Sequence, residues 1–165
     1  MDINGITAPA TPNQYDADIA IAKEASRLHL WRDLENQHRN FSTFILNLCN
    51  SHGCAAPSLD VDPGTTPQYL HEDGSLGHIV LDRYSVVSML HELGHHFLYD
   101  EATCVTYSEW VFANAFPVSF SRLERDARGY LCKPGTGVAA PVFYNTGEYG
   151  LANTDSPATI NTETM

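Results

Sequence analysis

Apolar residues in the first third of the chain repeat with the spacing of an α-helix. One run extends from Tyr15 to about Arg39, and a second run follows it and ends near Gly53. The face residues are Ile21, Ala25, Leu28 and Trp31 in the first run and Phe41, Phe44, Ile45 and Leu48 in the second. Positions three and four residues apart share one face of a helix, so this pattern predicts two amphipathic helices. Gly53 is the expected stop of the second helix.

The middle of the chain has the pattern of short strands. Pro57 and Pro63 bracket a strand candidate at 58–62. Two further runs, 69–72 and 76–82, flank the dipeptide Asp73-Gly74. Because Asp-Gly is favoured in tight hairpin turns, these runs predict a pair of antiparallel strands.

Helical periodicity returns after Asp82, which is the expected N-cap of a helix at 84–99. The apolar face of this helix consists of Val86, Leu90, Leu93 and Phe97. A further helix is predicted at 106–116, where Pro117 ends or kinks it, and a last one at about 119–131. Helices followed by a small antiparallel sheet and then more helices predict the α+β fold class.

The segments outside these elements predict one folded domain at residues 14–132 between two irregular ends. Residues 1–13 are rich in Pro, Thr and Asn and predict an irregular leader. Residues 133–165 contain no Lys or Arg after Lys133 and are loop-like in composition. We expect this C-terminal tail to wrap around the domain or to contact a protein partner.

The composition limits the partners of the chain. Of its 165 residues 43% are apolar, enough for one domain with a proper core. It has 20 acidic residues against 9 Lys and Arg, and its net charge is −11. Nucleic acids and anionic membranes need a basic footprint, so we expect neither as a partner. No signal peptide and no apolar run of about 18 residues is visible, so we expect a cytoplasmic protein.

Four cysteines are too few for a disulfide scaffold in a chain of this length. They are Cys49, Cys54, Cys104 and Cys132. We expect free thiols, with one bridge, Cys49–Cys54 or Cys104–Cys132, as the alternative. A structural four-cysteine zinc site needs two short paired spacings, and only the first pair is close in sequence.

Eight histidines are an unusual number here, and two of them form a motif. Residues 91–96 read His-Glu-Leu-Gly-His-His, which matches H-E-x-x-H. Four residues turn a helix by about 400°, so the rings of His91 and His95 lie one turn apart on one face. Two imidazoles in that position can bind one Zn²⁺, and Glu92 can take a proton from a zinc-bound water. Gly94 is costly inside a helix and indicates that another backbone approaches closely.

A catalytic zinc ion needs a third protein ligand and one open position. Three acidic residues follow the motif, namely Asp100, Glu101 and Glu109. We favour Glu109, because it opens the next predicted helix after a turn long enough for an antiparallel return. Glu101 is second and Asp100 third. The alternative role for Glu109 is as part of a capping box at 106–109.

The metzincin spacing offers another arrangement of three ligands. It would place glycine at position 98 and histidine at position 101, where this chain has Leu98 and Glu101. The chain also has no later Met-turn. We therefore disfavour that class.

Three segments together resemble the ImmA/IrrE family of gluzincin-type metallopeptidases. They are the strand end at 80–82, the motif helix at 91–95 and residues 109–116, Glu-Trp-Val-Phe-Ala-Asn-Ala-Phe. That family pairs a strand and an H-E-x-G-H helix with a second helix reading E-x-x-A-N-x-F. The resemblance covers about residues 76–117. It departs where Glu109 stands four residues before Ala113 and where Pro117 follows the phenylalanine.

The resemblance implies a minimal zincin-like fold with an active-site helix, a small antiparallel sheet and flanking helices. It implies His91, His95 and Glu109 as zinc ligands and Glu92 as general base and acid. Asn114 would orient a histidine. The strand at 76–82 would be the edge along which an extended peptide pairs.

The sequence thus predicts a zinc metallopeptidase that hydrolyses peptide bonds of a protein substrate. The alternative is a non-catalytic zincin fold that serves as a binding or structural part of a larger, phage-related assembly. Four tyrosines are candidates for stabilising the transition state, namely Tyr99, Tyr107, Tyr144 and Tyr149. Among the other histidines, His96 is expected at the surface or supporting the site, and His52 is expected to be an ordinary surface group.

Overall fold

The computed structural model describes residues 5–27, 34–125, 127 and 131–132 of the chain. The α-helices are α1 (Asp16–Arg27), α2 (Gln37–His52), α3 (Val86–His96), α4 (Glu101–Ala115) and α5 (Pro117–Ser121), with a 3₁₀ turn at Leu34–Asn36. The strands are β1 (Ser58–Val61), β2 (Gln68–Leu70), β3 (His78–Leu81), β4 (Glu124–Arg125) and β5 (Leu131–Cys132). This mixture of helices and a small sheet is consistent with the predicted α+β class. The predicted tail at 133–165 lies outside the described residues.

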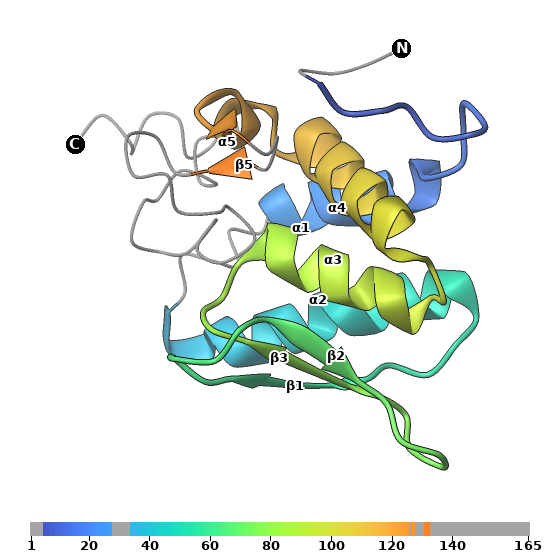
Figure 1. Ribbon diagram of the computed structural model, residues 1–165, viewed down its shortest axis with the longest axis vertical. Coiled ribbons are helices and arrows are strands. Elements are labelled where there is room, and N and C mark those ends of the chain that lie inside the picture. Colours follow the sequence, from blue (N-terminus) through green and yellow to red (C-terminus); the bar gives the residue numbers. More distant parts are fainter. Residues whose placement is uncertain (1–4, 28–33, 126, 128–130, 133–165) are drawn as a thin grey trace.

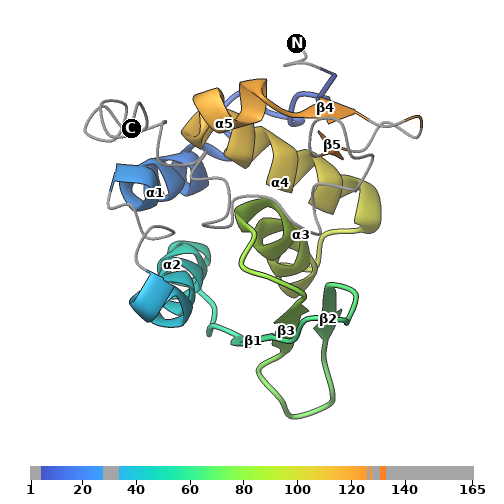
Figure 2. The ribbon, with the colours of Figure 1, turned by 90° about the vertical axis from the view of Figure 1, so that its left-hand side faces the viewer.

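Helix α3 lies at the centre of the molecule (Figure 1). It packs against α4 on one side and against β2 and β3 on the other. Figure 2 shows these layers from the side, with the sheet below α3 and α4 above it. Helix α1 contacts both α2 and α4 and closes the core. Helix α3 is therefore held between a helix and the sheet.

The main sheet has the order β1-β3-β2 and is mixed. The antiparallel pairing of β2 with β3 confirms the predicted hairpin. The prediction of an antiparallel sheet is wrong for β1, because β1 pairs in parallel with β3. Strand β3 is consequently the central strand, and the prediction that it forms a free edge is also wrong. Ile79 and Leu81 of β3 are fully buried, which accounts for the apolar residues in this strand.

Two predicted helix starts are corrected by the caps that the structure contains. Ser85, and not Asp82, caps α3, because its side chain accepts a hydrogen bond from the Ser88 amide at 3.2 Å. Asp100 caps α4, accepting from the Thr103 amide at 2.8 Å. Helix α4 therefore begins at residue 101 and not at 106. Its buried residues face several directions, so its start shows no clear apolar stripe.

The end of the described chain also differs from the prediction. Helix α5 ends at residue 121, whereas the sequence predicts a helix to about 131. Pro117 occupies its first turn, where a missing amide hydrogen costs nothing. The strands β4 and β5 then form a short antiparallel pair in place of the remaining helical turns. Among the described residues, no helix is long and apolar enough to span a membrane.

The turn from α3 to α4 contains a residue in an unfavourable backbone conformation. Leu98 has a φ of 69°, in the left-handed region that residues with a Cβ atom avoid. Its amide donates to the His95 carbonyl at 3.0 Å, and the Tyr99 amide donates to the Gly94 carbonyl at 3.0 Å. These two bonds form a Schellman motif, which reverses the chain immediately after α3.

Gly94 allows the two helices to approach closely. A Cβ atom at this position would lie 2.7 Å from Cys104 Sγ on α4. Any larger residue would therefore push α4 away from α3. This contact confirms the prediction that another element approaches the glycine.

We predict that Leu98→Gly stabilises the protein by about 0.5–1 kcal/mol. The left-handed conformation costs a residue with a Cβ atom about 1–2 kcal/mol, and the greater freedom of glycine in the unfolded chain offsets part of that gain. The Leu98 side chain is 91% exposed, so little packing is lost. Urea unfolding of Leu98→Ala is the control, because alanine keeps the backbone cost. Equal stabilisation by both variants would contradict the explanation.

Candidate metal centre

Three side chains converge where α3 ends and α4 begins. Glu101 Oε1 lies 3.3 Å from His91 Nε2 and 3.1 Å from His95 Nε2, and Glu101 Oε2 lies 3.1 Å from His91 Nε2. One ligand atom from each residue lies within 4.8 Å of the other two. The Schellman turn produces this convergence, because it brings residue 101 back over the last turn of α3.

These separations fit a tetrahedral zinc site. Ligand atoms that each lie 2.0–2.1 Å from one metal ion are about 3.3 Å apart along the edges of a tetrahedron. The His–Glu separations of 3.1–3.3 Å match those edges. Two imidazole nitrogens and a carboxylate are also the donor set of many catalytic zinc sites. The residues present therefore fit a zinc ion.

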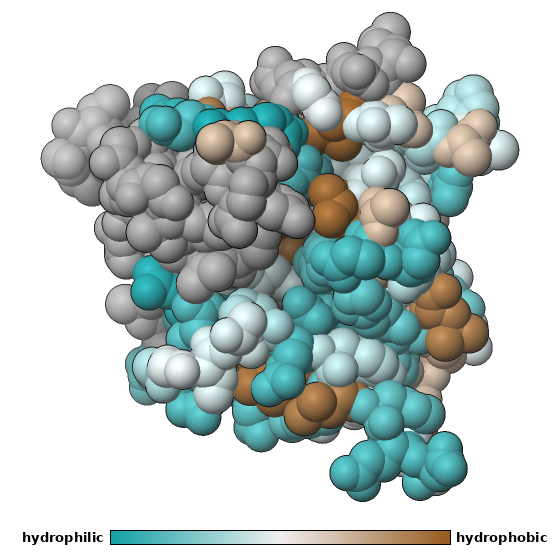
Figure 3. Space-filling view, in the orientation of Figure 1, coloured by the Kyte–Doolittle hydropathy of each residue, from teal (hydrophilic) through white to brown (hydrophobic). Residues whose placement is uncertain are grey.

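The site opens towards solvent on one side. The Glu101 side chain is 68% exposed, whereas His95 is 30% and His91 14% exposed. In the orientation of Figure 1, hydrophilic residues cover the surface over α3 (Figure 3). Three ligands from the protein side leave room for a fourth ligand from solvent.

The surroundings of His91 favour the protonation state that metal binding needs. Burial is the main cause that lowers the pKa of His91, and the nearby Glu101 carboxylate only partly opposes it. A lowered pKa keeps the imidazole neutral at pH 7, and a neutral nitrogen has the lone pair that binds a metal ion.

Glu92 is buried beside this cluster. The residue as a whole is only 7% exposed. Burial, and secondly the charge of Glu101, raise the pKa of Glu92 to about 7. A carboxyl group with this pKa can both accept and return a proton near neutral pH.

The structure does not bring Glu109 to the two histidines. Glu109 is buried on α4, and its Oε1 accepts a hydrogen bond from Arg125 Nη2 at 3.0 Å. Burial raises the pKa of Glu109, and Arg125 opposes that rise. Glu109 also does not cap a helix, because it lies inside α4. Arg125 thus compensates this buried carboxylate, and Glu101 takes the position beside the motif.

Three other predicted site residues have structural partners instead. Tyr107 is fully buried and donates its hydroxyl hydrogen to Asp18 Oδ2 at 2.5 Å, so it is not accessible to a substrate. Asn114 donates to the Trp110 carbonyl at 2.8 Å and does not orient a histidine by this bond. Tyr99 packs among the rings of Tyr15, Phe97 and Tyr107. Tyr144 and Tyr149 lie outside the described residues.

Sequence reasoning missed a polar network that links His52 at the surface to the buried side chains of Asp18 and Tyr107. His52 Nε2 lies 2.8 Å from Asp18 Oδ2, and the imidazole stacks on Phe97 with ring centroids 3.6 Å apart. His52 thus lies at the surface, as predicted, but its imidazole has a buried carboxylate as partner. Asp18 connects α1 to α2 through His52 and to α4 through Tyr107. An acidic residue in the first turn of α1 gives no sequence signal for such a role.

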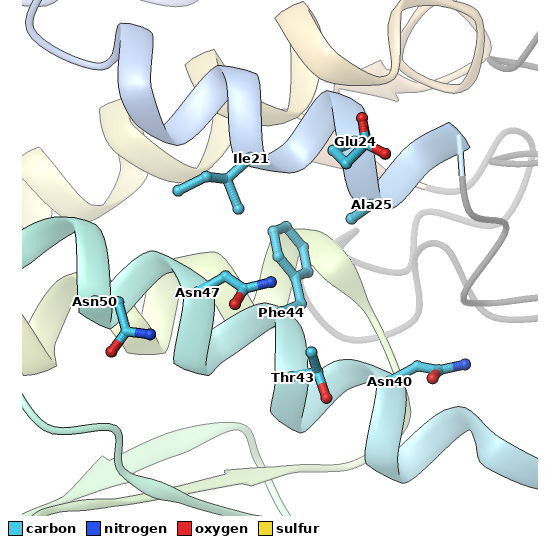
Figure 4. Close-up of a pocket in the computed structure, with 8 residues that line it drawn as sticks. All are labelled: Ile21, Glu24, Ala25, Asn40, Thr43, Phe44, Asn47 and Asn50. Carbon is cyan, nitrogen blue, oxygen red and sulfur yellow. The ribbon is translucent and has the colours of Figure 1, made fainter.

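A groove between α1 and α2 is separate from the histidine cluster (Figure 4). Its volume is about 320 Å³. It is lined by Ile21, Glu24, Ala25, Asn40, Thr43, Phe44, Asn47 and Asn50. None of these is a histidine or cysteine, so the groove does not extend the metal centre.

Comparisons with known proteins do not assign a family to this fold and site. Searched against protein-family models, curated proteins and solved structures, the chain gives no significant match. The interpretation of the site therefore depends on its own geometry.

We predict that Glu101→Gln weakens zinc binding at least tenfold, because the amide replaces a charged ligand oxygen. Glu109→Gln is the matched control and should bind zinc like the unmodified protein, because its carboxylate contacts Arg125. A competition titration with a chromogenic chelator measures both affinities. The reverse order of effects would restore Glu109 as the ligand.

We predict that Glu92→Gln stabilises the metal-free protein above pH 7. The folded-state pKa is raised from 4.5 to about 7, so Glu92 must be protonated to be buried without cost. Its stability contribution is fully present below pH 4.5 and is lost as the pH rises through about 7. The shift corresponds to about 3 kcal/mol.

Urea unfolding of both proteins at several pH values tests this linkage. The stability of Glu92→Gln relative to the unmodified protein should increase between pH 4.5 and about pH 7 and then level off. A difference that does not change with pH would contradict the raised pKa.

Proposed function

We propose that this protein is a zinc-dependent metallopeptidase that hydrolyses peptide bonds of a protein substrate. His91, His95 and Glu101 would hold the zinc ion, and Glu92 would be the general base and acid. The observation that carries the proposal is the set of His–Glu separations of 3.1–3.3 Å next to a buried carboxyl group. Neither a surface ion pair nor a solvated helix face requires Glu92 to be buried.

The geometry of the α3–α4 turn supports Glu101 as the third ligand. The metzincin spacing, which the residue types at these positions disfavour, has glycine at position 98 and a ligand at position 101. Glycine is the residue that most readily adopts a left-handed conformation. Leu98 has this conformation, with a φ of 69°, and Glu101 contacts both histidines. The chain thus meets the spacing with a carboxylate in place of the third histidine. The gluzincin alternative would take its third ligand from Glu109 instead.

A bound zinc ion would supply Lewis acidity, polarising the scissile carbonyl and lowering the pKa of water towards 7. The remaining chemistry belongs to Glu92. Its carboxylate would accept the proton of the attacking water and later donate it to the leaving amine. A pKa of about 7 suits both transfers, because neither protonation state is then strongly favoured.

Strand β2 is the best candidate to align an extended peptide. Strand β3 is covered on both sides, so a peptide can add only to the outer strands β1 and β2. Of these two, β2 packs against α3, which carries the motif. Main-chain pairing along β2 would bind a peptide with little dependence on its side chains.

We predict that Glu92→Gln abolishes cleavage and retains zinc. Loss of a general base costs about 10²–10⁴-fold in rate, whereas the three zinc ligands are untouched. Cleavage of an unfolded protein substrate is followed by mass spectrometry, and the zinc content is measured in the same samples. Glu24→Gln, which changes an exposed carboxylate on α1, is the control and should cleave normally.

Two outcomes would count against the peptidase proposal. Full cleavage by Glu92→Gln would exclude the proposed base. Stoichiometric zinc without cleavage by the unmodified protein would favour the alternative, a zinc-stabilised binding or structural component.

A further inference from the structure

A second group of potential metal ligands lies where the end of α3 meets the end of α2. Its members are Cys49, Cys54 and His96, and one ligand atom of each lies within 4.8 Å of the other two. Cys49 is fully buried, and Cys54 and His96 are partly buried. They share no residue with the group formed by His91, His95 and Glu101.

The local backbone explains why the two cysteines meet. Gly53 follows α2 in the left-handed conformation, with a φ of 73°. Its amide donates to the Asn50 carbonyl at 3.1 Å, and the Cys54 amide donates to the Cys49 carbonyl at 3.0 Å. This is a Schellman motif, in which the residue after the glycine folds back onto the residue five positions earlier. The end of α2 thus presents two thiols together.

The third side chain arrives from a different element and is held in a fixed orientation. His96 is the last residue of α3. Its Nδ1 lies 2.7 Å from the Tyr69 hydroxyl, and its Nε2 lies 2.7 Å from the Ala55 carbonyl oxygen. Tyr69 in turn packs against Gly77, where a Cβ atom would lie 2.2 Å from its hydroxyl oxygen. Several residues therefore position this imidazole beside the thiols.

We propose that Cys49, Cys54 and His96 form a second metal site for Zn²⁺ or a similar thiophilic divalent ion, with three protein ligands and one position left for solvent. Two thiolates and one imidazole are a donor set that such ions prefer over Ca²⁺ or Mg²⁺. On binding, each thiol releases its proton to solvent and forms a metal–sulfur bond. One His96 nitrogen exchanges its hydrogen-bond partner for the metal, and the other keeps the ring oriented.

A metal ion bound at this site would cross-link three segments of the chain. It would join the end of α2, the end of α3 and the loop that leads into β1. His95 would then bind the catalytic ion while its neighbour His96 anchors the same end of α3 through a different group of ligands. The proposal does not depend on peptidase activity, because it uses different residues and a different donor chemistry.

Cobalt substitution separates the two sites, because only a thiolate ligand gives an intense near-ultraviolet charge-transfer band with Co²⁺. The double variant His91→Ala/His95→Ala, reduced and then freed of metal, is titrated with Co²⁺. We expect one ion per chain and the thiolate band. The double variant Cys49→Ser/Cys54→Ser, with His91 and His95 intact, should lose the band and still bind one ion.

Two controls keep the test specific. Cys104→Ser changes another buried thiol and should retain the band. His96→Gln keeps both thiols and should weaken Co²⁺ binding to this site at least tenfold, measured in the background without His91 and His95. Far-ultraviolet circular dichroism confirms that each variant is folded. If the double cysteine variant does not fold, Cys54→Ser alone, which changes a partly buried thiol, replaces it.

Three results would overturn the proposal. The first is the absence of a thiolate band in the reduced protein without His91 and His95. The second is a band that survives the loss of Cys49 and Cys54. The third is a thiol titration of unreduced, metal-free protein in which these two cysteines are already oxidised to a disulfide.

Discussion

The close contact of α3 with α4 is the constraint on which the rest of the structure depends. Gly94 lets Cys104 approach to a distance that no side chain would permit. Leu98 accepts an unfavourable φ so that the chain reverses within a few residues. The return of the chain places Glu101 over His91 and His95. The turn that packs the two helices together therefore also brings the candidate ligands together.

Charge is distributed unevenly in the core that surrounds this contact. Glu109 has Arg125 as a partner, and Asp18 has Tyr107 and His52. Burial of Glu92 has no such compensation, and the charge of Glu101 adds to its cost. A partner offsets part of the cost of burying a carboxylate, whereas a carboxylate buried without a partner keeps a raised pKa that is typical of functional sites. This contrast separates the structural acids from the proposed catalytic one.

The elements that sequence reasoning placed well are those with a strong local signal. The turn at Asp73-Gly74 and the stop at Gly53 follow from backbone preferences and were predicted. Helix α4 was placed five residues late, because it is buried on several sides and lacks a single apolar stripe. The parallel pairing of β1 could not be seen, because it depends on which side of β3 the strand docks. The choice of partner strand produces no repeating pattern of apolar residues in the sequence.

The sequence by itself determined which candidate ligands share α3, and the tertiary structure decided which side chains from other elements join them. Spacing along one helix was enough to place His91 and His95 on one face, because a helix brings positions four residues apart together. Glu92 follows His91 directly. The carboxylate that joins them depends on how α4 leaves the turn, and so Glu101 rather than Glu109 lies beside the histidines. The meeting of Cys49 and Cys54 is likewise local, whereas only the packing of α3 beside α2 brings His96 to them. The geometry within one helix or turn follows from the local sequence, whereas contacts between elements depend on how the core packs.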